Sequence, residues 1–333
     1  MNPTQFRPTY SVVVPVYNSS ESLPKLAERL KLVFEEHLKD SYEIVFVDDS
    51  SPNPETWTTL RALATYDRRI RIFQLARNFG QGGALLCGMK QARGQWVITM
   101  DDDLQHYPED IPKLVAHRDH DVVIGRFPAK KASWLKKLSS RMKSRLDCKL
   151  LGMPEGLVST PFKLMKRQVT EAMLSIRTPR PFIIALVLRV TSDLVNVETR
   201  HAEREHGESN YSLARSLSLI SGLLFNNSSA LLRMMAVFGF CLSGLSVLYG
   251  GFLIAQKLLK PEISHGWTSL MVVILMLSGF IICCIGILGE YVSRLIETSE
   301  NRPTFIVGRT FDQAEDEPVQ DIMPIRMPTA KRQ

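Results

Sequence analysis

Two long uncharged segments near the carboxyl end constrain the fold of this chain more than any other feature. Met234–Gln256 and Trp267–Gly289 contain no Asp, Glu, Lys or Arg, and each is about 23 residues long, while a helix needs roughly 20 apolar residues to cross a bilayer. Only residues 257–266 separate the two runs. The sequence therefore predicts an antiparallel transmembrane hairpin. Two buried core helices of a soluble domain are the alternative, and twin uncharged runs of this length disfavour it.

Basic residues flank the two runs and set the predicted orientation. Arg215 and Arg233 precede the first run, and Arg294 and Arg302 follow the second. Positively charged residues collect on the cytoplasmic side of membrane proteins. We therefore expect a multi-pass protein of the cytoplasmic (inner) membrane, with its larger amino-terminal part facing the cytoplasm. Glycines in the first run, such as Gly239, offer a surface for a homo-oligomer through the hairpin.

Residues 10 to about 200 have a different pattern, in which short apolar runs alternate with helical spacing. The predicted strands are Tyr10–Val16, Glu43–Asp48, Ile70–Leu75, Trp96–Met100 and Asp121–Gly125. Such alternation favours an α/β fold, with a Rossmann-like, mostly parallel sheet and helices on both faces. In sheets of this kind, ligands bind beyond the carboxyl ends of the strands. Polar residues that follow the strands are therefore the first candidates for chemistry.

The strongest of these candidates is the acidic segment Asp101-Asp102-Asp103, which follows an apolar strand. Three adjacent carboxylates repel one another, and a divalent cation relieves that repulsion. Carboxylate and amide oxygens suit Mg²⁺ or Mn²⁺ held jointly with substrate phosphates. A solvated acidic turn that caps the next helix is the alternative, and the position directly after a strand favours the functional interpretation.

A second polar segment, Asp48-Asp49-Ser50-Ser51, also follows an apolar strand. Its carboxylates and hydroxyls are suited to accept hydrogen bonds from a base N–H and from ribose hydroxyls. The alternative is an ordinary turn capped by these side chains. Tyr17, just beyond the first strand, either packs on a base or belongs to the core.

The formal net charge of +7 fits a nucleic acid, an anionic membrane surface or a phosphorylated substrate. Trp134–Arg145 reads as a cationic amphipathic helix with one aromatic residue. Its proximity to the predicted spans favours a membrane-facing role that includes binding of a lipid phosphate, and no nucleic-acid partner is expected. The chain has no phosphate-binding G-x-x-x-x-G-K-[ST] motif, which excludes a P-loop ATPase.

Taken in order, the motifs resemble those of family 2 glycosyltransferases that act on polyprenyl phosphates. This group includes dolichol-phosphate mannosyl- and glucosyltransferases and undecaprenyl-phosphate aminoarabinose transferase. The matching segments are Val14-Pro-Val-Tyr-Asn18, Val47-Asp-Asp-Ser-Ser51, Arg77-Asn-Phe-Gly-Gln81, Met100-Asp-Asp-Asp-Leu-Gln105 and Gly207-Glu-Ser209. The resemblance covers residues 10 to about 305. It implies a GT-A fold and an inverting transfer of a sugar from a nucleotide sugar, UDP-linked by preference, to a polyprenyl phosphate.

The resemblance also implies roles for individual residues, matched position by position. The residues implied to hold the nucleotide are Pro15, Tyr17, Asp48, Asp49, Gln81, Asp101 and Asp102. Those implied to bind the metal and the diphosphate are Asp101, Asp103 and Gln105. The acceptor phosphate is assigned to Arg126, Lys136, Ser140 and Arg204. Asp103, Arg126 and Arg204 are the implied catalytic residues.

The chain departs from this family pattern at three places. Ser19 stands where the family often has Glu, and Asn210 replaces the Lys that usually follows Gly-Glu-Ser. More important, residues 157–161 carry no carboxylate, although the family usually has an Asp there that is a candidate catalytic base. A phosphate acceptor is already ionised near neutral pH, so it needs positioning more than deprotonation.

The predicted domain organisation follows from these patterns. The expected parts are a GT-A domain at 1–209, juxtamembrane amphipathic helices at 210–232, transmembrane helices at 233–257 and 267–290, an extracytoplasmic loop at 258–266, and a cytoplasmic tail at 291–333 that is disordered from about residue 308. Two further functional hypotheses stay open at this point. One is a non-enzymatic membrane scaffold or lipid-carrier partner with a degenerate transferase domain, and the other is a transferase that uses a different lipid acceptor.

Overall fold

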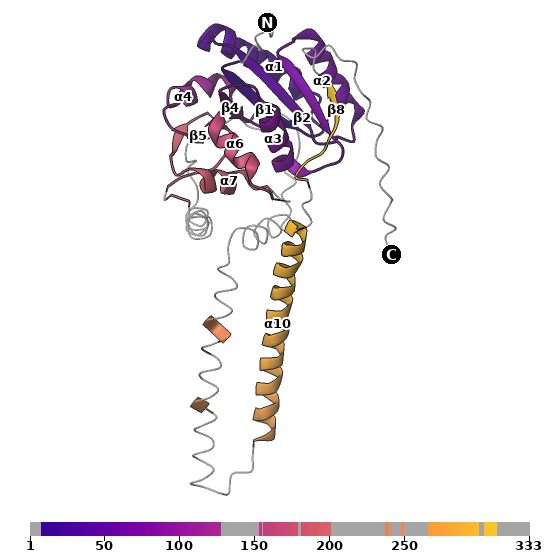
Figure 1. The fold of residues 1–333 in the computed structure, drawn as a ribbon, viewed down its shortest axis with the longest axis vertical. Helices are drawn as coiled ribbons and strands as arrows, with labels where there is room; N and C mark the ends of the chain where they lie inside the picture. Colours follow the sequence, from indigo (N-terminus) through magenta and orange to yellow (C-terminus); the bar gives the residue numbers. More distant parts are fainter. Residues whose placement is uncertain are drawn as a thin grey trace. The chain divides into compact units, whose positions relative to one another are not determined.

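A computed structural model describes residues 8–127, 153–154, 156–178, 181–200, 237–239, 241, 248–249, 266–299 and 303–311. The chain divides into two compact units, each of which is described by itself. The first unit comprises Met1–Arg145, Gly152–Ser209 and Arg302–Gln333, and the second comprises Leu146–Leu151 and Asn210–Asn301. The first unit holds the sheet and its helices, and the second holds a single long helix among its described residues (Figure 1).

The first unit is built on an eight-stranded sheet with the strand order β7-β5-β6-β4-β1-β2-β3-β8. The strands are β1 (Tyr10–Val16), β2 (Tyr42–Asp48), β3 (Ile70–Leu75), β4 (Trp96–Thr99), β5 (Val122–Arg126), β6 (Lys163–Lys166), β7 (Leu194–Glu198) and β8 (Val307–Phe311). β1 pairs in parallel with β2 and β4, as do β2 with β3 and β5 with β7. β6 is antiparallel to β4 and β5, and β8 is antiparallel to β3, so the sheet is mixed.

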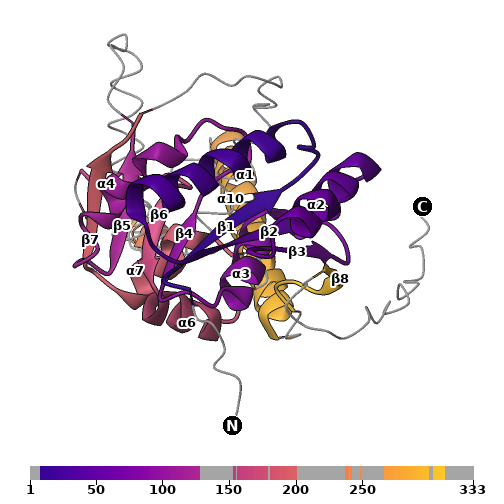
Figure 2. The ribbon, with the colours of Figure 1, turned by 90° about the horizontal axis from the view of Figure 1, so that it is seen from above.

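Helices cover both faces of this sheet. They are α1 (Ser22–Leu32), which continues as a π-helix η1 (Val33–Leu38), α2 (Pro54–Tyr66), α3 (Gly80–Gln91), the 3-10 turn η2 (Pro108–Asp110), α4 (Ile111–Val115), α6 (Arg167–Ser175) and α7 (Ile183–Val190). Figure 2 shows α1 and α2 on one face and α3, α6 and α7 on the other. The first unit therefore has the three layers that the alternating pattern predicts.

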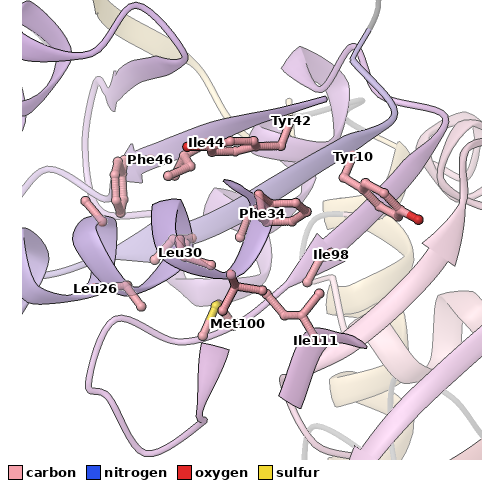
Figure 3. Packing of buried hydrophobic residues seen from close by; sticks show 14 of the residues in the cluster. Tyr10, Leu26, Leu30, Phe34, Tyr42, Ile44, Phe46, Ile98, Met100 and Ile111 are labelled. Carbon is pink, nitrogen blue, oxygen red and sulfur yellow. The ribbon is translucent and has the colours of Figure 1, made fainter. Parts of the chain in front are cut away.

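The core between α1 and the sheet is rich in aromatic residues. Phe34 stacks on Tyr42 with ring centroids 4.5 Å apart, and the ring centroids of Tyr10 and Phe34 are 5.7 Å apart. Figure 3 shows this cluster together with Leu26, Leu30, Ile44, Phe46, Ile98, Met100 and Ile111. Alternate residues of β1 and β2 face α1, because successive side chains of a strand point to opposite faces.

On the opposite face, a glycine allows α3 to approach the sheet closely. A Cβ atom added at Gly88 would lie 2.3 Å from Val13 Cγ1 and 3.2 Å from Val47 Cγ2, so a larger residue would clash with β1 and β2. The close packing fixes the position of α3 against both strands. It thereby also fixes the amino end of α3, which follows the carboxyl end of β3 in the chain.

One prediction made from the carboxyl-terminal sequence was wrong. The tail was expected to be disordered from about residue 308, but Val307–Phe311 forms β8, and Thr310 pairs with Phe73 of β3. The prediction was wrong because the acidic, proline-containing residues that follow outweighed a short segment suited to a strand. β8 covers what would otherwise be an open edge of the sheet.

The predicted transmembrane hairpin is not found among the described residues. Helix α10 (Trp267–Ser299) contains the second predicted span and continues beyond it. No helix in the described part of the chain combines the length and the hydropathy that a bilayer crossing requires. Most of the first predicted span, and all of residues 210–232, lie outside the described residues.

A buried polar network lies near the amino ends of the central strands. Glu43 accepts a hydrogen bond from Ser11 Oγ at 2.6 Å, and its other oxygen is 3.1 Å from Arg71 Nη1. Arg71 also donates to the carbonyl of Gln91 at 2.6 Å. The side chains of Glu43 and Arg71 are only 6% and 7% exposed. Loss of either charge would therefore remove a buried ion-pair partner of the other.

We expect Glu43→Ala to lower the free energy of unfolding by about 3–5 kcal/mol, because Arg71 would lose its buried counter-charge. Glu35→Ala is the matched control, since Glu35 pairs with Arg69 at 2.7 Å with both side chains more than a third exposed. This control should cost about 0–1 kcal/mol. Urea unfolding of the purified full-length protein measures both effects, and equal losses would contradict the assigned role of Glu43.

Candidate active site

Three polar loops lie beyond the carboxyl ends of β1, β2 and β4, which are neighbours in the sheet. Each loop contains a non-glycine residue in the left-handed region, namely Asn18 (φ 58°), Ser50 (φ 57°) and Leu104 (φ 60°). Such residues cost about 1–3 kcal/mol each and collect at functional sites. The loops at the carboxyl ends of these strands, where the sequence predicts the site, therefore also have a strained backbone.

Asp48 shapes the loop after β2. Its Oδ1 accepts hydrogen bonds from Ser51 N at 3.0 Å and Ser51 Oγ at 2.5 Å, and its Oδ2 accepts one from Gln74 Nε2 at 2.7 Å. The side chain is completely buried. Asp48 was predicted to bind the nucleotide, but both of its carboxylate oxygens already have partners within the protein. Its two hydrogen bonds with Ser51 position that residue just beyond the strand.

Asp49, also predicted to bind the nucleotide, connects the loop after β2 to the amino end of α3. Its two oxygens accept hydrogen bonds from Phe79 N at 2.7 Å and from Gly80 N at 2.8 Å. Burial raises the pKa of this carboxyl group, and the two backbone bonds oppose the rise. Gly80 has a φ of 79°, a conformation that favours glycine, so the Arg77–Gln81 motif owes its shape to this pair of residues.

The acidic loop after β4 (residues 101–105) is connected to both neighbouring loops. Asp101 Oδ1 accepts a hydrogen bond from Gln81 Nε2 at 2.6 Å, and Asp102 Oδ2 accepts one from Tyr17 N at 3.3 Å. Asp103 Oδ1 accepts from Gln105 N at 3.1 Å within the loop. The structure therefore brings together six residues that the resemblance had assigned to the nucleotide or to the metal.

The carboxylates of the acidic loop are half-buried and crowded. The pKa of Asp101 rises to about 7 because of burial, with further contributions from the charges of Asp103 and Asp102. The pKa of Asp102 rises to about 6, again chiefly through burial, while hydrogen bonds from Ser19 and Tyr17 oppose the rise. This loop is thus a site where a positive charge would be strongly favoured.

The donor atoms of the acidic loop fit a hard divalent cation held partly by a substrate. Within the described residues, no group of three or more His, Cys, Asp or Glu side chains is arranged to hold a metal by itself. Asp101 and Asp103 offer carboxylate oxygens, and Mg²⁺ is commonly bound by one or two carboxylates plus the phosphates of a substrate. The residues present therefore match a site that a nucleotide diphosphate completes.

Lys163, at the start of β6, is a charged residue of this region that the sequence did not identify as functional. It is 4% exposed, and its Nζ donates a hydrogen bond to the carbonyl of Thr160. Burial lowers its pKa to about 8, and the negative charge of Asp101 opposes the decrease. The only sequence signal was its place within Phe162-Lys163-Leu164, because β6 itself was not predicted.

Arg126, at the end of β5, was predicted to bind the acceptor phosphate. It pairs with a residue of the neighbouring strand β7. Its Nη2 lies 2.9 Å from Glu198 Oε1, and both side chains are well exposed. In the sheet, β6 lies between β5 and β4, the strand that leads into the acidic loop. Lys136, Ser140 and Arg204 lie outside the described residues.

The segment without the expected carboxylate, residues 157–161, is held against β7 and β5. Val158 N donates to Asn196 Oδ1 at 2.8 Å, and Asn196 Nδ2 donates to the Val158 carbonyl at 2.8 Å. Thr160 Oγ1 donates to the carbonyl of Gly125 at 2.5 Å. This segment is fixed by amide and hydroxyl groups, and its sequence supplies no candidate base.

The other predicted residues differ in exposure. Pro15 is buried within β1, opposite Val47 of β2. Tyr17 is 49% exposed, so its ring is available to pack on a ligand and is not a core residue. Gln105 is half-buried.

Comparison with known proteins identifies the class to which this fold and site belong. The family model described as glycosyl transferase family 2 matches residues 11–174. The undecaprenyl-phosphate 4-deoxy-4-formamido-L-arabinose transferase of Proteus mirabilis (strain HI4320) is 34% identical over 301 residues, which cover 89% of this chain and 92% of that protein. The uncharacterized glycosyltransferase YkcC of Bacillus subtilis (strain 168) is 32% identical over 305 residues, covering 91% and 94%.

This chain therefore belongs to glycosyltransferase family 2, and it is an enzyme of that family. Its mixed α/β sheet is GT-A-like, as the resemblance implied. Among solved structures, glucosyl-3-phosphoglycerate synthase from Mycobacterium tuberculosis in complex with UDP is similar with a TM-score of 0.46 and 17% identity, covering 65% of this chain and 79% of that chain.

Proposed function

We propose that this enzyme transfers one sugar from a nucleotide sugar, UDP-linked by preference, to a polyprenyl phosphate such as undecaprenyl phosphate. The proposal rests on one observation: Tyr17 and Gln81 form hydrogen bonds with the acidic loop beyond the carboxyl ends of the central strands. Relatives that match nearly the whole chain bear the name of undecaprenyl-phosphate sugar transferases, which favours the same class of acceptor.

On the donor side, Asp101 and Asp103, with Gln105, would hold Mg²⁺ or Mn²⁺ against the diphosphate. The cation would supply neutralisation of the charge that develops on the leaving diphosphate. Gln81 orients Asp101 through its 2.6 Å hydrogen bond, and Asp102 fixes the backbone of Tyr17. The half-exposed ring of Tyr17 and the loop shaped by Asp48 and Asp49 would then receive the nucleoside.

On the acceptor side, an oxygen of the lipid phosphate attacks C1 of the sugar. The new C1–O bond forms as the bond from C1 to the donor diphosphate breaks, so the anomeric configuration inverts and a nucleoside diphosphate leaves. The attacking oxygen carries no proton that must be removed, since the second pKa of such a phosphate is about 6. Because no base is needed to remove a proton, the proposed reaction does not require a carboxylate in residues 157–161.

The acceptor phosphate would be positioned by Arg126 together with Lys136, Ser140 and Arg204. Guanidinium groups bind phosphate in a bidentate manner, which gives direction as well as charge. We further propose that the enzyme acts at the cytoplasmic membrane with the sheet facing the cytoplasm, because a polyprenyl phosphate is a membrane lipid and because two uncharged runs lie between β7 and β8 in the sequence.

A screen of nucleotide sugars against undecaprenyl phosphate tests the proposal. We expect one donor to give a lipid product heavier than the acceptor by one sugar residue, as measured by mass spectrometry. Undecaprenol, which lacks the phosphate, is the control acceptor and should give no product. A product formed equally well on undecaprenol would exclude the proposed acceptor, and no product with any donor would favour the scaffold hypothesis.

A further inference from the structure

A buried lysine lies beside the acidic loop and has no part in the mechanism described above. Lys163 opens β6, which lies between β4 and β5, and it pairs with Thr99 on one side and Ile124 on the other. Thr99 is the last residue of β4 and precedes Asp101 by two positions. The strand register therefore sets Lys163 beside the chain just as it enters the acidic loop.

Burial of this ammonium group requires compensation. A buried charge without partners is strongly unfavourable, and Lys163 is 4% exposed. One hydrogen bond to the Thr160 carbonyl satisfies a single N–H of the three. The electrostatic attraction between Lys163 and Asp101 offsets a further part of the cost of burial.

The positive charge of Lys163 has a consequence for metal binding. An ammonium group that attracts Asp101 also repels a divalent cation bound to Asp101. Inside a protein this electrostatic repulsion is stronger than in water. Two carboxylates beside a fixed positive charge are therefore a weak site for a metal alone. The negative diphosphate of the donor restores the favourable balance.

We infer that Lys163 is an internal counter-cation that stabilises the acidic loop before substrate binds and makes divalent metal binding depend on the donor diphosphate. Lys163 acts through Asp101 and is thus a positioning residue. The inference deepens the proposed function and depends on its metal site. In this arrangement the cation enters together with the nucleotide, and the site without a donor has low affinity for the metal.

The test measures Mn²⁺ binding to the purified full-length protein at pH 7 by electron paramagnetic resonance, with and without UDP, GDP or dTDP. Lys163→Met is expected to bind Mn²⁺ without nucleotide about tenfold more tightly than the wild type, and nucleotide should then enhance its Mn²⁺ binding less.

Lys166→Met is the matched control, because it makes the same substitution at the other end of β6, where Lys166 pairs with Asp121 at 2.9 Å. It should leave Mn²⁺ affinity unchanged, as should Lys163→Arg, which keeps the charge. Lys163→Gln removes the charge and retains a donor for the Thr160 carbonyl. It should reproduce the effect if Lys163→Met fails to fold.

Two outcomes would overturn the inference, and they are distinguishable. If the wild type binds Mn²⁺ with nucleotide but the charge-removing variants bind Mn²⁺ alone no more tightly than the wild type, the role of Lys163 is wrong and the proposed metal site stands. If the wild type binds no Mn²⁺ with any of the nucleotides, the metal site and the inference fall together.

Discussion

Asp103→Asn is expected to lower kcat by about 10³-fold, because the variant loses a negative charge at the point where the diphosphate must be neutralised. Asn has nearly the same shape as Asp, and its carbonyl oxygen retains the hydrogen bond that Gln105 N donates at 3.1 Å. The loop should therefore fold as before, so the loss reports on charge alone. Steady-state transfer to undecaprenyl phosphate, with the donor identified by the screen, measures the effect.

Asp119→Asn is the control for the Asp103 variant. Asp119 is 79% exposed and lies in the turn after α4, away from the acidic loop in sequence. Its substitution should leave kcat within about twofold of the wild type, as is usual for an exposed side chain. Near-normal turnover by Asp103→Asn, with the variant folded, would refute the assignment of Asp103 to the metal and diphosphate.

Arg126→Ala should lower kcat/KM for the lipid phosphate by about 10²-fold, chiefly through a higher KM for the lipid. Arg126 is the last residue of β5, its side chain is exposed enough to meet a phosphate, and among the described residues Glu198 is its side-chain partner. Kinetics with varied lipid at saturating donor measure this change. The KM for the nucleotide sugar should stay unchanged.

Two further variants sharpen the test of Arg126. Glu198→Gln removes the carboxylate that holds Arg126 at 2.9 Å, so acceptor affinity should stay the same or rise. Arg189→Ala, at an exposed position near the end of α7, controls for the loss of one surface arginine and should have no effect. If Arg126→Ala instead raises the KM of the donor, Arg126 belongs to the nucleotide site.

The central strands were predictable because buried parallel strands are continuous apolar runs. The bounds expected for β1 and β3 match the structure, those for β2 and β4 differ by one residue at one end, and β5 is shifted by one residue at both ends. β6 was missed because its four residues, Lys163–Lys166, begin and end with lysine. The sequence pattern gives no sign that the first of these lysines is buried, since only pairing with β4 and β5 places it inside.

The acidic loop was predictable for a related reason, because Asp101 comes just after the apolar strand β4, with only Met100 between them. The contacts made by Asp48 and Asp49 were not predictable. Asp49 binds the backbone of Phe79 and Gly80, about 30 residues away, and this contact depends on loops with left-handed residues such as Ser50. Local sequence sets which groups are available, and the packing of α3 on the sheet decides which of them meet.

The nucleotide released during transfer tests the central claim most directly. The purified enzyme would be supplied with the donor found in the screen and with undecaprenyl phosphate whose terminal oxygens carry ¹⁸O. The account predicts release of an unlabelled nucleoside diphosphate and a lipid monophosphate sugar that retains all the label. Release of a nucleoside monophosphate, with a lipid diphosphate sugar as product, would show that a sugar phosphate is transferred and would contradict attack of the lipid phosphate on C1.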